Sequence, residues 1–142
     1  MTRLDGRVVL VTGTARGIGR SSALHFARAG ALVAGCDLDR AGADETVELV
    51  RAEGGEMVST APVDLGDLDA TRAWIDETAV ALGGIDVLFN NASSPRVGPF
   101  AELTPEDWSY TIRNELDLVY FATAAAWPHL RARGGGLVLN IA

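Results

Sequence analysis

Three glycines near the amino end, Gly13, Gly17 and Gly19, follow the apolar run 8–11 and precede an amphipathic stretch. A strand, a glycine turn and a helix in this order bind the diphosphate of a dinucleotide, because Cβ atoms would prevent the sharp turn and the close approach to phosphate. The helix would point its free N–H groups and the positive end of its dipole at the anion. A glycine-rich turn without a ligand is the alternative, but the strand-then-helix context favours the binding site.

The segment Thr12 to Gly19 resembles the cofactor motif of the short-chain dehydrogenase/reductase family, Thr-Gly-x-x-x-Gly-x-Gly, at every fixed position. Later segments match in order along the whole chain. The resemblance implies an NAD(P)-binding domain of the Rossmann type. It also implies that the turn residues that hold the cofactor are Gly13, Thr14, Arg16, Gly17, Ile18 and Gly19.

Strands and helices alternate with short connections, which predicts an α/β doubly wound parallel sheet in a single domain over residues 1–142. The expected strands are 7–12, 32–36, 57–63, 85–89 and 137–142, and the expected helices are 19–29, 43–52, 68–82 and 105–133. Thr104, Pro105 and Asp107 form a start signal for the last helix, with a capping box. The resemblance implies five strands in the order 3-2-1-4-5, truncated relative to the family's seven-stranded fold.

The composition excludes several classes of partner. The net charge is −7, which disfavours nucleic acid and anionic membrane surfaces. The apolar stretch 118–127 is too short to cross a bilayer. The single cysteine, Cys36, fits a reducing, cytoplasmic setting, and His25 and His129 have no partners at metal-ligand spacing, so no metal site is expected.

Asp37 directly follows the second expected strand. The resemblance implies that its carboxylate accepts hydrogen bonds from the adenosine ribose hydroxyls. It would also repel the extra phosphate of NADP, since two like charges about 4 Å apart cost roughly 1–4 kcal/mol. Arg16 acts in the opposite direction, because a basic residue there can face that phosphate. NAD is therefore expected and NADP is disfavoured, while an ordinary turn carboxylate is the alternative for Asp37.

Two further segments follow strands and resemble family motifs. By resemblance, the Asp64 carboxylate takes the adenine amino group and Leu65 flanks the ring; an aspartate that merely starts a turn is the alternative. The run 90–93, Asn-Asn-Ala-Ser, resembles the family's Asn-Asn-Ala-Gly. Its first residue would brace neighbouring strands, and Asn91 and Ala92 would lie along the ribose on the nicotinamide side. A generic turn rich in asparagine is the alternative.

The family's active-site asparagine comes seven residues after the aromatic residue of the last helix's start signal, which places Glu115 there and Asn114 one position early. In a regular helix at about 100° per residue, Glu115 falls on the apolar stripe and Asn114 points away from it. Glu115 is therefore expected to face inward, either hydrogen-bonded near Asn90 or in a proton path, because a buried carboxylate must be paired or protonated. Asn114 would face inward only if the helix contained a one-residue bulge.

The family's catalytic Tyr-x-x-x-Lys pair is missing, because all basic residues other than histidine are arginine. Tyr110 and Tyr120 are followed four positions later by Asn114 and Ala124. The resemblance implies an oxidoreductase that transfers hydride between nicotinamide and a small alcohol or ketone, present here as an inactive cofactor-binding part whose full-length parent is a homo-oligomer. A non-catalytic dinucleotide-binding sensor or interaction module is the alternative. The unguarded last strand favours the fragment.

Overall fold

A computed structural model describes residues 3–141 of the chain. Five parallel strands form one sheet in the order β3-β2-β1-β4-β5, which confirms the predicted fold class and strand order. The strands are β1 (Val8–Thr12), β2 (Leu32–Cys36), β3 (Glu56–Thr60), β4 (Val87–Asn90) and β5 (Leu137–Asn140). Their apolar composition suits a sheet that is covered on both faces.

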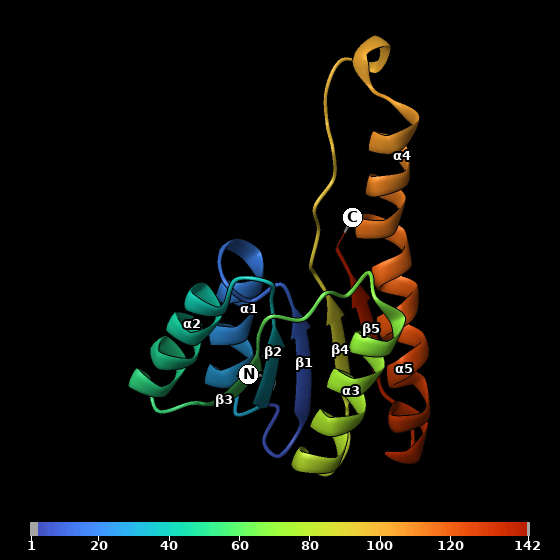
Figure 1. Cartoon of the computed structure of the whole chain (residues 1–142). Coiled ribbons are helices and arrows are strands. Elements are labelled where there is room, and N and C mark those ends of the chain that lie inside the picture. The colour runs from blue at the N-terminus through green and yellow to red at the C-terminus, as the bar shows by residue number, and fades with distance from the viewer. Residues whose placement is uncertain (1–2, 142) are drawn as a thin grey trace.

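Helices cover the two faces of the sheet in pairs (Figure 1). Helices α1 (Gly17–Arg28) and α2 (Arg40–Ala52) lie on one face and pack through alanine and valine side chains. Helices α3 (Leu68–Leu82) and α5 (Leu118–Ala132) lie on the other face. This arrangement is the three-layer sandwich that right-handed crossovers between parallel strands produce.

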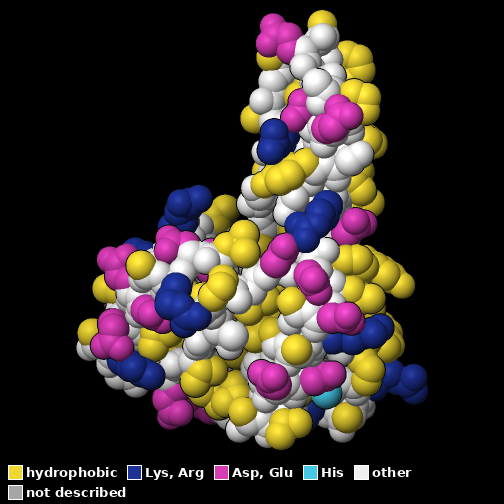
Figure 2. Space-filling view, viewed as in Figure 1, with side chains coloured by type: hydrophobic (Ala, Val, Ile, Leu, Met, Phe, Trp, Pro, Cys, Tyr) yellow, Lys and Arg dark blue, Asp and Glu magenta, His cyan; other side chains and the backbone are white. Residues whose placement is uncertain are grey.

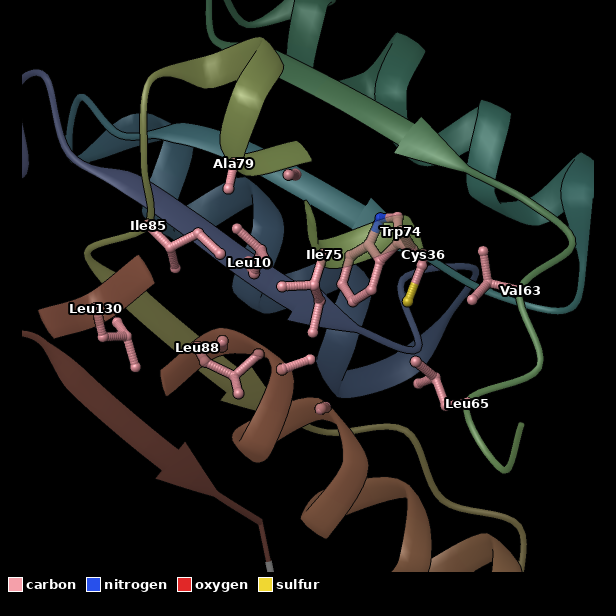
Figure 3. Packing of buried hydrophobic residues seen from close by; sticks show 14 of the residues in the cluster. Leu10, Cys36, Val63, Leu65, Trp74, Ile75, Ala79, Ile85, Leu88 and Leu130 are labelled. Atoms are coloured by element: carbon pink, nitrogen blue, oxygen red, sulfur yellow. The ribbon is translucent and has the colours of Figure 1, made fainter. Parts of the chain in front are cut away.

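The larger of the two cores lies under α3 and α5, as Figure 3 shows. Leu10 and Leu88 project from the sheet against Ile75 and Trp74 of α3, and all four are at most 3% exposed. Each fully buried side chain of this size stabilises the fold by about 1.5–3 kcal/mol. The core holds the strands in place, and with them the loops that follow their carboxyl ends.

Several element boundaries differ from the predicted ones. Helix α2 begins at Arg40 rather than at residue 43, because the Asp39 side chain accepts a hydrogen bond from the Gly42 amide and caps it. Strand β3 ends at Thr60 rather than at residue 63, since Pro62 has no N–H to donate to a neighbouring strand. Strand β5 ends at Asn140, and the predicted last residue of this strand, 142, lies outside the described residues.

The predicted last helix contains an irregular turn. Helix α4 (Pro105–Ile112) leads into a π-helical turn, η2 (Arg113–Asp117), and then into α5. The predicted capping box is confirmed, because the Thr104 side chain accepts a hydrogen bond from the Asp107 amide and Asp107 accepts one in return. A 3₁₀ turn (Phe100–Glu102) precedes α4.

Helix α4 and the loop before it project beyond the carboxyl ends of the strands as an arm (Figure 1). None of the residues of α4 is buried. Figure 2 shows hydrophobic side chains along one edge of this arm, and Trp108 is 68% exposed. Trp127 of α5 is also exposed, whereas Trp74 packs in the core.

Candidate functional site

A cavity of about 350 Å³ opens at the carboxyl ends of the strands, beside the glycine turn after β1. The parallel register brings Thr12, Cys36 and Asn90 to this edge, so that the loops after β1, β2, β3 and β4 meet there. Ligands of open parallel sheets bind in this place. The cavity is lined by Gly13, Ala15, Arg16, Asp37, Leu38, Asp39, Val63, Asp64, Leu65, Gly66, Asn91, Ala92, Ser93, Ser94, Asn114 and Leu118.

The glycine turn leaves no room for side chains at two positions. Gly13 has φ +73°, and a Cβ on it would lie 2.9 Å from the Cα of Ala92. A Cβ on Gly19 would meet the carbonyl group of Gly13. Glycine at these positions therefore lets the turn close tightly against both α1 and the loop after β4.

Helix α1 differs from α2, α3 and α4, each of which begins with a side-chain cap. The side chains of Asp39 and Asp67 cap α2 and α3, and Thr104 caps α4. At the start of α1, Arg16 makes no side-chain capping hydrogen bond, and the first turn has no acidic residue. The first amides of α1 therefore suit an anionic ligand, which would supply both acceptors and negative charge.

The residues of the predicted turn do not all face the cavity. Gly13 and Arg16 line it, while Gly17, Ile18 and Gly19 form the first turn of α1. Thr14 is fully buried, and its hydroxyl donates to the Cys36 carbonyl over 3.4 Å. Thr14 thus ties the turn to β2.

Asp37 holds the glycine turn in position. One oxygen of its carboxylate accepts a hydrogen bond from the Ala15 amide at 2.8 Å, and the other accepts one from the Asp39 amide at 2.9 Å. The carboxylate is therefore oriented at the cavity rim before any ligand arrives. Asp39 and Asp64 also line the cavity and add two further carboxylates to it.

Asp64 and Leu65 both line the cavity, and Asp64 forms an ion pair that the sequence did not indicate. The Arg113 guanidinium donates to both oxygens of the Asp64 carboxylate, at 2.7 and 3.2 Å. This pairing, opposed by partial burial and aided by the Gly66 amide, holds the pKa of Asp64 below its usual value. Asp64 is therefore an ionised carboxylate at neutral pH.

The asparagines after β4 join three parts of the site. The Asn90 side chain donates to Asn140 of β5 at 2.9 Å and to Thr123 of α5 at 3.1 Å, so it braces neighbouring elements as predicted. The Asn91 side chain donates to the carbonyls of Thr12 and Gly13, at 3.0 and 3.1 Å. The loop after β4 and the glycine turn are thereby locked together.

The predicted orientation of Asn114 and Glu115 is wrong. Asn114 is 9% exposed and lines the cavity, whereas Glu115 does not line it. The helical-phase argument assumed 100° per residue, but the π turn Arg113–Asp117 inserts one residue and rotates Asn114 inward. Glu115 instead accepts hydrogen bonds from the Ser93 hydroxyl and the Ser94 amide, at 2.7 and 2.6 Å, which agrees with its expected pairing near Asn90.

The cavity is also lined by residues that the sequence patterns did not indicate. Most of them adjoin predicted residues after a strand end and could have been included on that ground: Ala15, Leu38, Asp39, Val63, Gly66 and Ser94. Leu118 follows the π turn, and its position depends on that irregularity. Burial raises the pKa of the Cys36 thiol strongly, so this cysteine packs as an unreactive apolar residue.

Among residues 3–141, no group of three or more histidine, cysteine, aspartate or glutamate side chains is arranged to hold a metal ion. His129 contacts Asp76 at 2.6 Å, and His25 contacts the Ser21 carbonyl of its own helix. Within the same residues, each helix is too short or too polar to cross a bilayer.

Comparisons with known proteins agree with this geometry. Residues 7–142 match the family model for short chain dehydrogenases. The chain is 35% identical over 140 residues to D-threitol dehydrogenase of Mycolicibacterium smegmatis and to 2-dehydro-3-deoxy-D-gluconate 5-dehydrogenase of Escherichia coli. These matches include 99% and 98% of this chain, respectively, and 54% of each relative.

A crystal structure from Burkholderia xenovorans, described as a short-chain dehydrogenase/reductase, superimposes with a TM-score of 0.94 at 33% identity. The superposition includes 100% of this chain and 58% of the Burkholderia xenovorans chain. Fold and site thus define a Rossmann-type α/β protein. The chain belongs to the short-chain dehydrogenase family, whose members bind a nicotinamide dinucleotide, and it spans about half the length of the curated relatives.

Proposed function

We propose that this chain is the dinucleotide-binding part of an oxidoreductase that transfers hydride between a nicotinamide cofactor and a small-molecule alcohol or ketone. The observation that carries the proposal is the start of α1, which lacks a side-chain cap and opens beside a cavity at the carboxyl edge of the sheet. A diphosphate supplies what this helix end lacks. We propose that the chain forms a single cofactor-binding domain.

Each wall of the cavity has a role in this proposal. Gly13 and the segment Arg16–Gly19 hold the diphosphate, with Thr14 fixing the turn from behind. Asp37 accepts hydrogen bonds from the adenosine ribose. Asp64 and Leu65 border the adenine, and the pair Asn91 and Ala92 borders the ribose on the nicotinamide side.

We propose NAD as the cofactor rather than NADP. The support is the Asp37 carboxylate, which the Ala15 and Asp39 amides hold at the cavity rim. A phosphate on the ribose would meet this negative charge and that of the neighbouring Asp39. Arg16, the one basic residue that lines the cavity among those described, offsets this repulsion only in part.

Asn114 is the residue that we propose for the family's active-site asparagine position, in place of Glu115. Its side chain is buried at the cavity and donates to the Tyr110 carbonyl at 2.8 Å. The sequence contains no lysine and therefore no Tyr-x-x-x-Lys pair. The nicotinamide, when bound, supplies the hydride chemistry, but no residue of this chain takes the place of that pair, so the isolated chain should not turn over alcohols or ketones.

The non-catalytic sensor or interaction module is the second reading, and we do not favour it, because the matched relatives are dehydrogenases. The proposal includes a cytoplasmic location and a homo-oligomeric full-length parent. It includes no role for nucleic acid, membrane or metal.

Fluorescence titration of the 142-residue chain with NADH tests the proposal. Two variants with matched backbone strain provide the control, because Gly13 and Gly54 both have positive φ, +73° and +80°. Gly13→Ala should weaken NADH binding by about tenfold or more, equal to roughly 1.4 kcal/mol, since its new Cβ meets Ala92. Gly54→Ala should leave the affinity unchanged. Equal effects of the two variants, or no binding by the parent chain, would remove the assignment.

A further inference from the structure

Arg113 joins two walls of the cavity although it does not line the cavity itself. Its guanidinium makes a two-pronged contact with the Asp64 carboxylate, at 2.7 and 3.2 Å. Asp64 belongs to the loop after β3, and Arg113 is the first residue of the π turn. The two residues are 49 positions apart in the sequence. A planar arginine fork fixes the orientation as well as the distance of its carboxylate partner.

The loop after β3 is shaped to receive this side chain. A Cβ on Gly66 would lie 2.5 Å from the guanidinium carbon of Arg113, so the guanidinium rests directly on the Gly66 backbone. The Gly66 amide also donates to the Asp64 carboxylate at 3.0 Å. Asp64, Gly66 and Arg113 thus form one packed unit at the proposed adenine end of the cavity.

The π turn is the element that needs this support. A π turn is a rare and less favourable geometry inside a helix, so specific contacts must hold it against reversion to a regular helix. Two such contacts are present: the ion pair from Arg113, and the hydrogen bond from the Asn114 side chain to the Tyr110 carbonyl at 2.8 Å. A nitrogen of the same guanidinium also lies 3.5 Å from the side-chain oxygen of Asn114.

We infer that Arg113 is a positioning residue that couples the adenine end of the cavity to the π turn, and so holds Asn114 in the cavity. This inference rests on the proposed function for its meaning, since it assigns adenine to the Asp64 loop. A bound adenine fixes the conformation of that loop. Through its ion pair with Asp64, Arg113 then stabilises the π turn that carries Asn114. Loss of the ion pair frees the turn to rewind and to rotate Asn114 outward.

The test uses the 142-residue chain and compares Arg113→Met with Arg96→Met. Arg96 is a matched control, because it also pairs with an aspartate, Asp107, on the same long helical segment, and its partner does not line the cavity. The probes are 5′-AMP, which reports the adenine end, and the side-chain amide protons of Asn114 in NMR spectra. Circular dichroism and the thermal midpoint show that each variant is folded.

Arg113→Met should weaken 5′-AMP binding by about fivefold, equal to roughly 1 kcal/mol, and should speed solvent exchange of the Asn114 amide protons in the ligand-free chain. Asp64→Asn should weaken 5′-AMP binding and speed Asn114 exchange to a similar extent. The double variant should show no larger change in either quantity than each single variant does. Arg113→Lys should retain only part of the 5′-AMP affinity and of the Asn114 protection, since lysine lacks the planar fork. Arg96→Met should change neither probe.

Unchanged Asn114 exchange in folded Arg113→Met and Asp64→Asn would overturn the inference, and so would additive effects of the two changes. Failure of the parent chain to bind both NADH and 5′-AMP would instead defeat the proposed function. The Asn114 exchange measurement needs no ligand and therefore still decides whether Arg113 holds the π turn.

Discussion

At the residue scale, Asp37 has two roles, a structural one and an electrostatic one, and measurements on a single variant can distinguish them. Its carboxylate orients the glycine turn through the Ala15 amide, and its charge stands at the cavity rim. In the proposed function, loss of the contact with the turn should weaken the binding of any dinucleotide, whereas loss of the charge should favour the phosphorylated one. The ratio of the two affinities therefore reports the charge alone.

Asp37→Asn should raise the affinity for NADPH relative to NADH by about tenfold or more, because a like-charge repulsion of roughly 1–4 kcal/mol is removed. Paired titrations with both cofactors measure this ratio. Asp67→Asn is the control, since Asp67 caps α3 outside the cavity and asparagine also caps helices well. A constant ratio in Asp37→Asn would show that the carboxylate does not face the ribose.

Site residues after the strand ends were predicted from the family resemblance, and the carboxyl edge of the parallel sheet brings these residues together. Asp37, Asp64 and Asn91 follow expected strands and match family motifs, and they do line one cavity. The inward position of Asn114 was not predicted, because it depends on a π turn that no local residue pattern announces. The turn is held by Arg113 and Asp64, two residues far apart in the sequence.

At the element scale, the helix caps differ in what their loss should cost. Thr104 caps α4, in which no residue is buried, while Asp67 caps α3, which carries Trp74 and Ile75 into the core. A capping side chain contributes about 1 kcal/mol to its helix. The loss of this contribution lowers the stability of the whole molecule only when the helix packs in the core and unfolds together with it.

Thr104→Ala should therefore speed amide hydrogen exchange in the first turn of α4 and leave the global thermal midpoint unchanged. Asp67→Ala should lower the midpoint by about 2–8 °C, because α3 and the core unfold together. Hydrogen exchange and thermal unfolding of both variants measure this difference. Equal losses of midpoint would show that the arm is part of the global folding unit.

The start of α4 was predicted at the correct residue, since threonine, proline and aspartate at these positions each satisfy a specific need of a helix end. The end of β3 was overestimated by three residues, because an apolar pattern does not report where strand pairing stops. Strand order was predicted through the family resemblance, and the alternation of elements alone gave only a parallel sheet.

At the scale of the whole molecule, Asp86 connects the start of β1 to the end of α5. Its carboxylate accepts hydrogen bonds from the Val8 amide at 2.9 Å, from Arg7 at 2.9 Å and from Arg133 at 3.0 Å. Burial opposes its ionisation, but these hydrogen bonds outweigh that effect and lower the pKa of Asp86. Folding therefore favours the ionised form.

Asp86→Asn should lower the free energy of unfolding at pH 7 by about 1–3 kcal/mol, the usual contribution of hydrogen bonds to a charged group. Because the folded-state pKa is lowered, this contribution is present above about pH 4, the unfolded pKa of aspartate, and is lost as the pH falls through the folded value. Urea unfolding at several pH values should show the parent and the variant converging at low pH. Glu53→Gln, which removes an exposed partner of Arg28, should cost far less. A difference for Asp86→Asn that stays constant down to pH 3 would contradict this assignment.

In the proposed function, a dinucleotide binds across the carboxyl edge of the sheet with its diphosphate at the start of α1. Backbone amide NMR spectra of the chain, recorded during a titration with NAD, test it most directly. We predict the largest shifts at the segments 13–19, 37–39, 64–66 and 91–94, which surround one cavity. Shifts concentrated outside these segments, or no shifts at saturating NAD, would contradict this assignment.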